Sequence, residues 1–142
     1  MGSAPEPYHN SFIRKGTLGN MSFRCRALRG AITIEENTAE SICQATEELL
    51  LKMVRENDVD IDEIASIIFT LTRDLDAVFP AAAARSLGWN QIPLLCCNEV
   101  EVPGSLPRCI RVLMHINTQK SPGELKHIYL RNAIDLRQDL AQ

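Results

Sequence analysis

Three charged residues stand where the surrounding sequence predicts burial. Arg29 lies within a strand-like run, on a face that it shares with small residues, and Arg111 lies in the middle of an alternating apolar run. Glu99 follows directly after the apolar residues 92–97. Because an unpaired charge in a partly buried place costs several kcal/mol, each of these side chains needs a partner or a ligand.

Arginine presents a planar fork of donors that matches a carboxylate and stays charged at any useful pH. Arg29 and Arg111, with Arg85 and Arg137 at the ends of expected helices, therefore predict an anion pocket for a small di-acid. Tyr129 would add a hydroxyl donor to that pocket. The structural alternative is that Glu99 pairs with one arginine and that the other arginines are solvated.

The motifs of covalent and metal catalysis are missing from the sequence. It contains no GxSxG, no HExxH, no glycine-rich phosphate loop and no matched Cys–His pair. Its three histidines, His9, His115 and His127, complete no metal-ligand spacing, so we expect no metal. An enzyme built from these residues has to work by positioning and charge stabilisation.

Four runs predict the strands that must hold these charges. They are residues 24–34, 66–72, 92–97 and 108–117. The second and third runs are almost wholly apolar, which is typical of strands buried on both faces. The fourth alternates, so that Arg111 faces away from Ile110 and Val112.

Three helices are expected between and after these strands. Apolar residues at helical spacing predict about five turns ending near Asn57, capped by Asn37 or Thr38, with Glu40 placed to close a capping box on Asn37. A short helix follows Pro80, and a single turn is expected near residues 60–64. A final helix is expected from Ser121, with a capping box to Glu124, and it would carry Tyr129 and Leu136.

The resulting order, β–α–β–α–β–β–α, predicts an α/β (α+β) fold with a mixed sheet and covering helices. The core is small for such a sheet, and several strands are apolar on both sides. We therefore expect a symmetric oligomer that buries the remaining face.

Composition places the chain among small globular proteins. It has 142 residues with a formal net charge of −3, which suits one domain, over residues 21–142, and disfavours nucleic-acid binding. Residues 1–20 are expected to be a disordered extension or an expression-tag remnant. No apolar run is long enough for a membrane span, and five cysteines without a framework predict reduced, mostly buried thiols in the cytoplasm.

Short segments spread along the chain carry a specific resemblance. They are residues 28–35 (LRGAITIE), 74–81 (DLDAVFPA), 109–112 (CIRV) and 127–130 (HIYL), together with Gly88, Trp89 and Pro93. In this order and spacing they resemble the monofunctional chorismate mutases of the AroH class, from about Leu28 to Leu140. The resemblance implies a homotrimer forming a pseudo-α/β-barrel, with active sites between neighbouring subunits. It also implies rearrangement of chorismate to prephenate, for phenylalanine and tyrosine biosynthesis, without a cofactor.

The resemblance also implies roles for individual residues. Arg111 matches the arginine at the ether oxygen of the substrate, Arg29 the arginine on a carboxylate, and Tyr129 the tyrosine that donates to that carboxylate. Glu99 matches the carboxylate at the ring hydroxyl. The remaining substrate-binding positions are Cys96 beside that hydroxyl, Phe79, Ala81 and Leu136 in the pocket wall, and Arg85 and Arg137 at the mouth.

Two departures from the family pattern concern the rim of this pocket. Residues 85–89 are one residue shorter than the family form, and Ala82 stands where some members carry lysine. Two other functions remain as alternatives: a non-catalytic trimeric binder of small carboxylates, and an imine or enamine deaminase on a similar scaffold.

Overall fold

The computed structural model describes residues 22–140, with side chains up to residue 136. The expectation for residues 1–20 therefore lies outside the described residues. The helices and strands are β1 (Arg24–Thr33), α1 (Ala39–Glu56), the 3₁₀ turn η2 (Ile61–Glu63), β2 (Ile64–Leu71), α2 (Ala81–Ser86), β3 (Leu94–Asn98), β4 (Cys109–Thr118), the 3₁₀ turn η3 (Pro122–Glu124), β5 (Ile128–Leu130) and the 3₁₀ helix η4 (Arg131–Leu140).

The strands form one mixed five-stranded sheet in the order β3-β2-β4-β1-β5. β4 runs antiparallel to both β1 and β2, whereas β3 and β5 run parallel to the strands that they border. β4, which carries Arg111, is the central strand, and its residues pair on both sides. The predicted α+β fold with a mixed sheet is confirmed.

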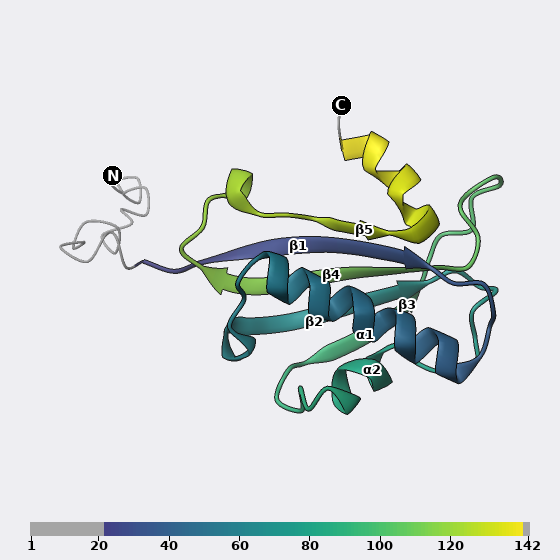
Figure 1. Cartoon of the computed structure of the whole chain (residues 1–142), viewed down its shortest axis with the longest axis horizontal. Coiled ribbons are helices and arrows are strands. Elements are labelled where there is room, and N and C mark those ends of the chain that lie inside the picture. Colours follow the sequence, from purple (N-terminus) through teal and green to yellow (C-terminus); the bar gives the residue numbers. More distant parts are fainter. Residues whose placement is uncertain (1–21, 141–142) are drawn as a thin grey trace, which may run out of the picture.

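Helix α1 covers one face of this sheet, with α2 beside it near β3 (Figure 1). The apolar stripe of α1 is fully buried and packs on Leu28, Ile32 and Phe69 of the sheet. Its members are Ile42, Ala45, Leu49, Leu50 and Met53. The helical period seen in the sequence therefore places the main core between α1 and the sheet.

The opposite face, here called the open face, is much less covered. At one end of it, Ala133 of η4 packs on Ala31 and Cys109. Farther along, its side chains are half-buried or exposed in the single chain, with Leu95 58% exposed. The members of this part of the open face are Ala27, Arg29, Ser66, Ile68, Thr70, Leu95, Cys97, Leu113 and His115.

The prediction of a helix from Ser121 is wrong. The capping box forms, with the Ser121 N–H and hydroxyl both donating to Glu124 Oε1, but the turn stops at Leu125, whose backbone is extended. Residues 128–130 then pair in parallel with β1, beside Gly30, as a fifth strand. The free edge of β1 offers backbone hydrogen bonds to this β-branched and aromatic segment, and tertiary pairing outweighs the local helix signal.

The prediction of β3 as a buried strand is also wrong. β3 borders only β2, and its residues are half-buried or exposed. All five cysteines are free, as expected, but only Cys109 is buried, so the expectation of mostly buried thiols fails in the single chain. An edge strand has neighbours on one side, so an apolar sequence does not by itself bury it.

One of the two predicted caps of α1 is confirmed. Thr38 is the N-cap and accepts from the Ser41 N–H at 3.1 Å, whereas the predicted capping box on Asn37 is wrong. Asn37 instead accepts from the backbone N–H groups of Asp76 and Ala77. Its side chain thereby ties the loop before α1 to the loop before α2.

Gly30 allows α1 to approach β1 closely, and this generates a stability prediction. A Cβ at Gly30 would lie 2.5 Å from Met53 Sδ and 3.1 Å from Leu49 Cδ1, both in the core. We expect Gly30→Ala to lower the free energy of unfolding by about 1–3 kcal/mol, because the core must shift to admit a methyl group. Urea unfolding at one fixed protein concentration measures the loss.

Gly123→Ala is the matched control, because a Cβ there meets nothing within 4 Å. If both variants unfold at the same urea concentration, the close approach at Gly30 does not constrain the core.

Candidate active site

Arg111 stands in a row of side chains that crosses the open face. In the sheet register it pairs with Ala31 of β1 on one side and with Thr70 of β2 on the other. Ala31 in turn pairs with Tyr129 of β5. Directly paired residues point to the same face, so β5, β1, β4 and β2 present Tyr129, Ala31, Arg111 and Thr70 in line. The alternation read from the sequence placed Arg111 correctly.

Glu99 compensates the charge of Arg111. It follows the end of β3, and its N–H donates to the Leu71 carbonyl at 2.8 Å, which holds its backbone against the end of β2. Its Oε2 lies 3.8 Å from Arg111 Nε, and the two side chains are 24% and 28% exposed. A pair that is three-quarters removed from water interacts more strongly than a surface pair.

A concavity of about 340 Å³ surrounds this ion pair. Its lining residues are Arg29, Ile68, Thr70, Glu99, Arg111, Val112 and Leu113. Two guanidinium groups face one carboxylate over an apolar floor, which leaves an excess of positive charge in the hollow. This hollow, here called the arginine pocket, is suited to an anion with an apolar body.

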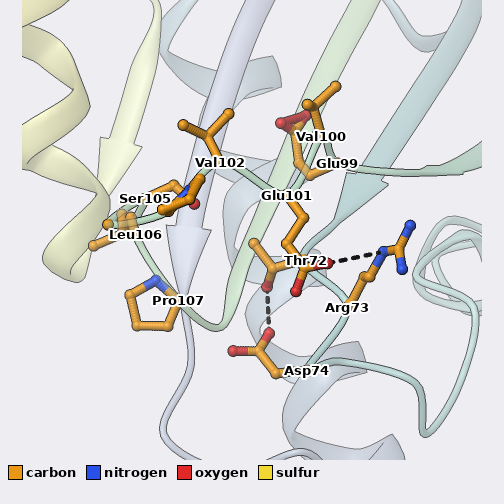
Figure 2. A pocket seen from close by; sticks show the side chains of 12 residues that line it. Thr72, Arg73, Asp74, Glu99, Val100, Glu101, Val102, Ser105, Leu106 and Pro107 are labelled. Atoms are coloured by element: carbon orange, nitrogen blue, oxygen red, sulfur yellow. Dashed lines mark hydrogen bonds and ion pairs between the residues drawn. The ribbon is translucent and has the colours of Figure 1, made fainter.

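A hydrogen-bonded clamp, part of which Figure 2 shows, joins the chain after β2 to the start of β4. The Thr72 hydroxyl donates to Asp74 and accepts from the Cys109 N–H, and the Arg108 N–H donates to Asp74. These bonds tie the end of β2 to the start of β4, two residues before Arg111. Figure 2 also shows the Arg73–Glu101 ion pair beside this clamp, in a second hollow that Glu99 borders.

The predicted substrate-binding residues on α2 and β3 form a cluster separate from the arginine pocket. The Cys96 thiol accepts from the Ala81 N–H and lies near Arg85, although burial raises its pKa overall. Cys96 pairs with Phe69 of the covered face, whereas its neighbour Cys97 pairs with Thr70 of the open face. Cys96 therefore points away from the arginine pocket, and the single chain does not bring the two groups together.

Phe79 and the residues near the C-terminus complete the predicted set. Phe79 is 69% exposed and lines another hollow, of about 470 Å³, beside Leu75 and Asn98. Tyr129 and Leu136 are half-buried and pack against the Ala31–Cys109 end of the open face. The side chain of Arg137 lies outside the described part of the chain.

Two residues of this site were missed in the sequence. His127 Nδ1 accepts from the Arg29 N–H at 3.0 Å, and burial, followed by the Arg29 charge, lowers the pKa of the imidazole. Thr70 lines the arginine pocket beside Arg111. Its signal was a hydroxyl between the apolar residues Phe69 and Leu71, on the same side of the strand as Ile68. The contact of His127 with Arg29 leaves no local pattern in the sequence.

Within residues 22–140, no group of three or more His, Cys, Asp or Glu side chains is placed to hold a metal ion. Helices in the same part of the chain are too short or too polar to cross a membrane. The arrangement that remains is a rigid set of cations around one carboxylate, whose chemistry is the binding and stabilisation of negative charge.

Comparison with known proteins agrees with this geometry. The family model described as chorismate mutase type I matches residues 25–140. Chorismate mutase AroH of Thermus thermophilus is 54% identical over 116 residues, covering 81% of this chain and 95% of the relative. Chorismate mutase AroH of Bacillus subtilis (strain 168) is 41% identical over 117 residues, covering 82% and 92%.

A solved structure of a chorismate mutase from Clostridium thermocellum superposes with a TM-score of 0.77. It is 52% identical and covers 78% of this chain and 98% of its own. On the family match and these identities, the chain belongs to the type I chorismate mutase family.

Proposed function

We propose that the chain rearranges chorismate to prephenate in the arginine pocket, with Arg111 as the central catalytic group. The observation that carries this proposal is the half-buried Arg111–Glu99 pair with Arg29 on the same pocket wall. The rearrangement breaks the ether C–O bond of the substrate while a C–C bond forms, and no atom or proton is gained or lost. It therefore needs neither a nucleophile nor a cofactor.

Negative charge grows on the ether oxygen in the transition state, and positive charge grows on the ring. Arg111 supplies donors to the oxygen, and Glu99 accepts from the ring hydroxyl and faces the electron-poor ring. Arg29 binds a substrate carboxylate, with Tyr129 as a second donor. A fixed guanidinium aimed at developing charge is effective because it needs no reorientation during the reaction.

The second cluster serves the same reaction from a neighbouring subunit of a homotrimer. Phe79, Ala81 and Cys96 lie away from the arginine pocket of their own chain, so a second copy seated on the open face would supply them. Arg85 and Arg137 then stand at the mouth and attract the dianion, while Leu136 contributes to the wall. The half-exposed apolar residues of the open face support this assembly.

We place the enzyme in the cytoplasm, as a source of prephenate for phenylalanine and tyrosine. The support for this location is the five free cysteines, which a reducing compartment maintains.

Arg111→Lys tests the catalytic assignment. Lysine keeps the charge but loses the planar fork, so we expect kcat for chorismate to fall by about 100-fold or more. Loss of chorismate and appearance of prephenate measure the rate. Arg55→Lys is the matched control, because Arg55 is exposed in the last turn of α1, and it should retain the wild-type rate. Near-normal turnover by Arg111→Lys would contradict the assignment of Arg111 as the central catalytic group.

The pH profile tests whether a proton moves in the reaction. The pKa of His127 lies below the usual 6.5, and burial raises the pKa values of Cys96 and Cys109 above the usual 9.0. The imidazole and the two thiols therefore stay uncharged at pH values between 6.5 and 9.0. We expect kcat to change by less than about twofold over this pH range. Protonated Nδ1 cannot accept from the Arg29 N–H, so activity should fall only at more acidic pH. A bell-shaped kcat profile centred on neutrality contradicts this chemistry.

Sedimentation velocity tests the assembly. We expect one species at three times the 15.9 kDa chain mass. Leu95→Asp places a charge on the open face outside the arginine pocket and should dissociate that species and abolish turnover, because an unpaired buried charge is costly. Gln44→Asp, on the exposed side of α1, is the control and should leave the trimer intact. An active monomer of the wild-type chain contradicts the shared site.

A further inference from the structure

Two polar atoms in the arginine pocket lack hydrogen-bond partners among the residues that the structure describes. They are the Thr70 hydroxyl oxygen, Oγ1, and the Arg111 Nε, and both are buried. Buried polar groups are nearly always hydrogen-bonded, so two such atoms in one pocket need an explanation. The ion-pair partner of Nε, Glu99 Oε2, is 3.8 Å away, which is too far for a hydrogen bond.

The sheet places these two unpartnered groups side by side. Thr70 and Arg111 are directly paired residues of β2 and β4, and both line the pocket that Glu99 borders. Paired residues on one face have their Cβ atoms about 5 Å apart, within reach of each other's side-chain atoms. The Nε–H is a donor without an acceptor, whereas a threonine hydroxyl can accept one hydrogen bond and donate another.

We propose that Thr70 is a positioning residue for Arg111, whose hydroxyl accepts from Arg111 Nε–H and donates to the Glu99 carboxylate when substrate fills the pocket. This inference rests on the proposed role of Arg111. The hydroxyl bridges the gap between Nε and Glu99, which turns a loose ion pair into a continuous hydrogen-bonded chain. With Nε fixed from behind, the guanidinium is held in one orientation, in which it can present a terminal nitrogen to the substrate.

Thr70 is suited to this task because of what surrounds it. Its neighbour two residues along β2 on the same face is the apolar Ile68, and the adjacent pocket wall is Leu113. The hydroxyl oxygen itself is buried, so the ionic groups beside it are its available hydrogen-bond partners. A donor–acceptor set arranged before the reaction stabilises charge without reorientation.

Thr70→Val removes the hydroxyl and keeps the shape of the side chain. We expect kcat to fall by about 10- to 100-fold, the size of one hydrogen bond to a charged group, with KM changed by less than about threefold. Thr70→Ser keeps the hydroxyl and should stay within a few-fold of wild type. Thr46→Val is the control, because it removes a buried hydroxyl of α1 outside the arginine pocket, and it should keep the wild-type kcat.

Urea unfolding distinguishes the positioning role of Thr70 from a purely structural role. Thr70→Val removes a buried hydroxyl that has no hydrogen-bond partner among the residues described, so its midpoint of urea unfolding should equal or exceed that of wild type. A parallel fall in unfolding midpoint and kcat would overturn the positioning role. Thr70→Ala serves as a second variant without the hydroxyl. Like Thr70→Val, it should lower kcat and leave KM nearly unchanged.

A double-mutant cycle identifies Arg111 as the group through which Thr70 acts. Lysine has no Nε–H, so Thr70→Val in an Arg111→Lys background should lower kcat by less than about threefold further. Independent, multiplicative losses would overturn the proposal, as would a Thr70→Ser variant as slow as Thr70→Val. If the wild-type protein binds chorismate but does not convert it, the proposed function is refuted. If the wild type is active and Thr70→Val has the same kcat, only the positioning role of Thr70 is refuted.

Discussion

A guanidinium in the central strand of a sheet must find negative charge, and much of this structure follows from that requirement. The Arg111 side chain is only 28% exposed, so water solvates its charge only in part. Glu99, directly after β3, places one carboxylate near this guanidinium. Its backbone N–H donates to the Leu71 carbonyl, which holds Glu99 against the end of β2. Arg29 then adds a second cation, which leaves the arginine pocket with an unbalanced positive charge. In the function we propose, a dianionic substrate would balance this positive charge.

The one-sided cover of the sheet explains where this pocket can exist. Helix α1 is packed so closely on β1 that Gly30 is needed at the contact, and core side chains fill the space between them. Among the described residues, Ala133, Leu136 and Tyr129 cover one end of the open face, and the apolar residues farther along it are half-buried or exposed in the single chain. A second copy on this face would remove that apolar surface from water and bring an α2–β3 cluster towards the arginines. Assembly and catalysis would then depend on the same surface.

The sequence predicted local structure best where one strong hydrophobic periodicity or one unusually placed charged residue dominated a segment. The α1 stripe and the alternation around Arg111 each follow from local geometry, and both are confirmed. The segment after Ser121 failed because a capping box signals only the first turn, whereas the free edge of β1 decided the rest. Thr70 and His127 entered the site through cross-strand register, and a single sequence does not reveal which residues of two distant strands will pair.

The central claim is that each site joins the arginine pocket of one chain to the α2–β3 cluster of another. Mixing chains tests it most directly: Arg111→Ala protein is unfolded and refolded together with Arg85→Glu protein, and chorismate turnover is measured. The account predicts that the mixture is more active than either refolded parent alone, because some sites combine an intact arginine pocket with an intact α2–β3 cluster. A mixture that sediments as mixed trimers, yet never exceeds the average of its two parents, would contradict a site shared between chains.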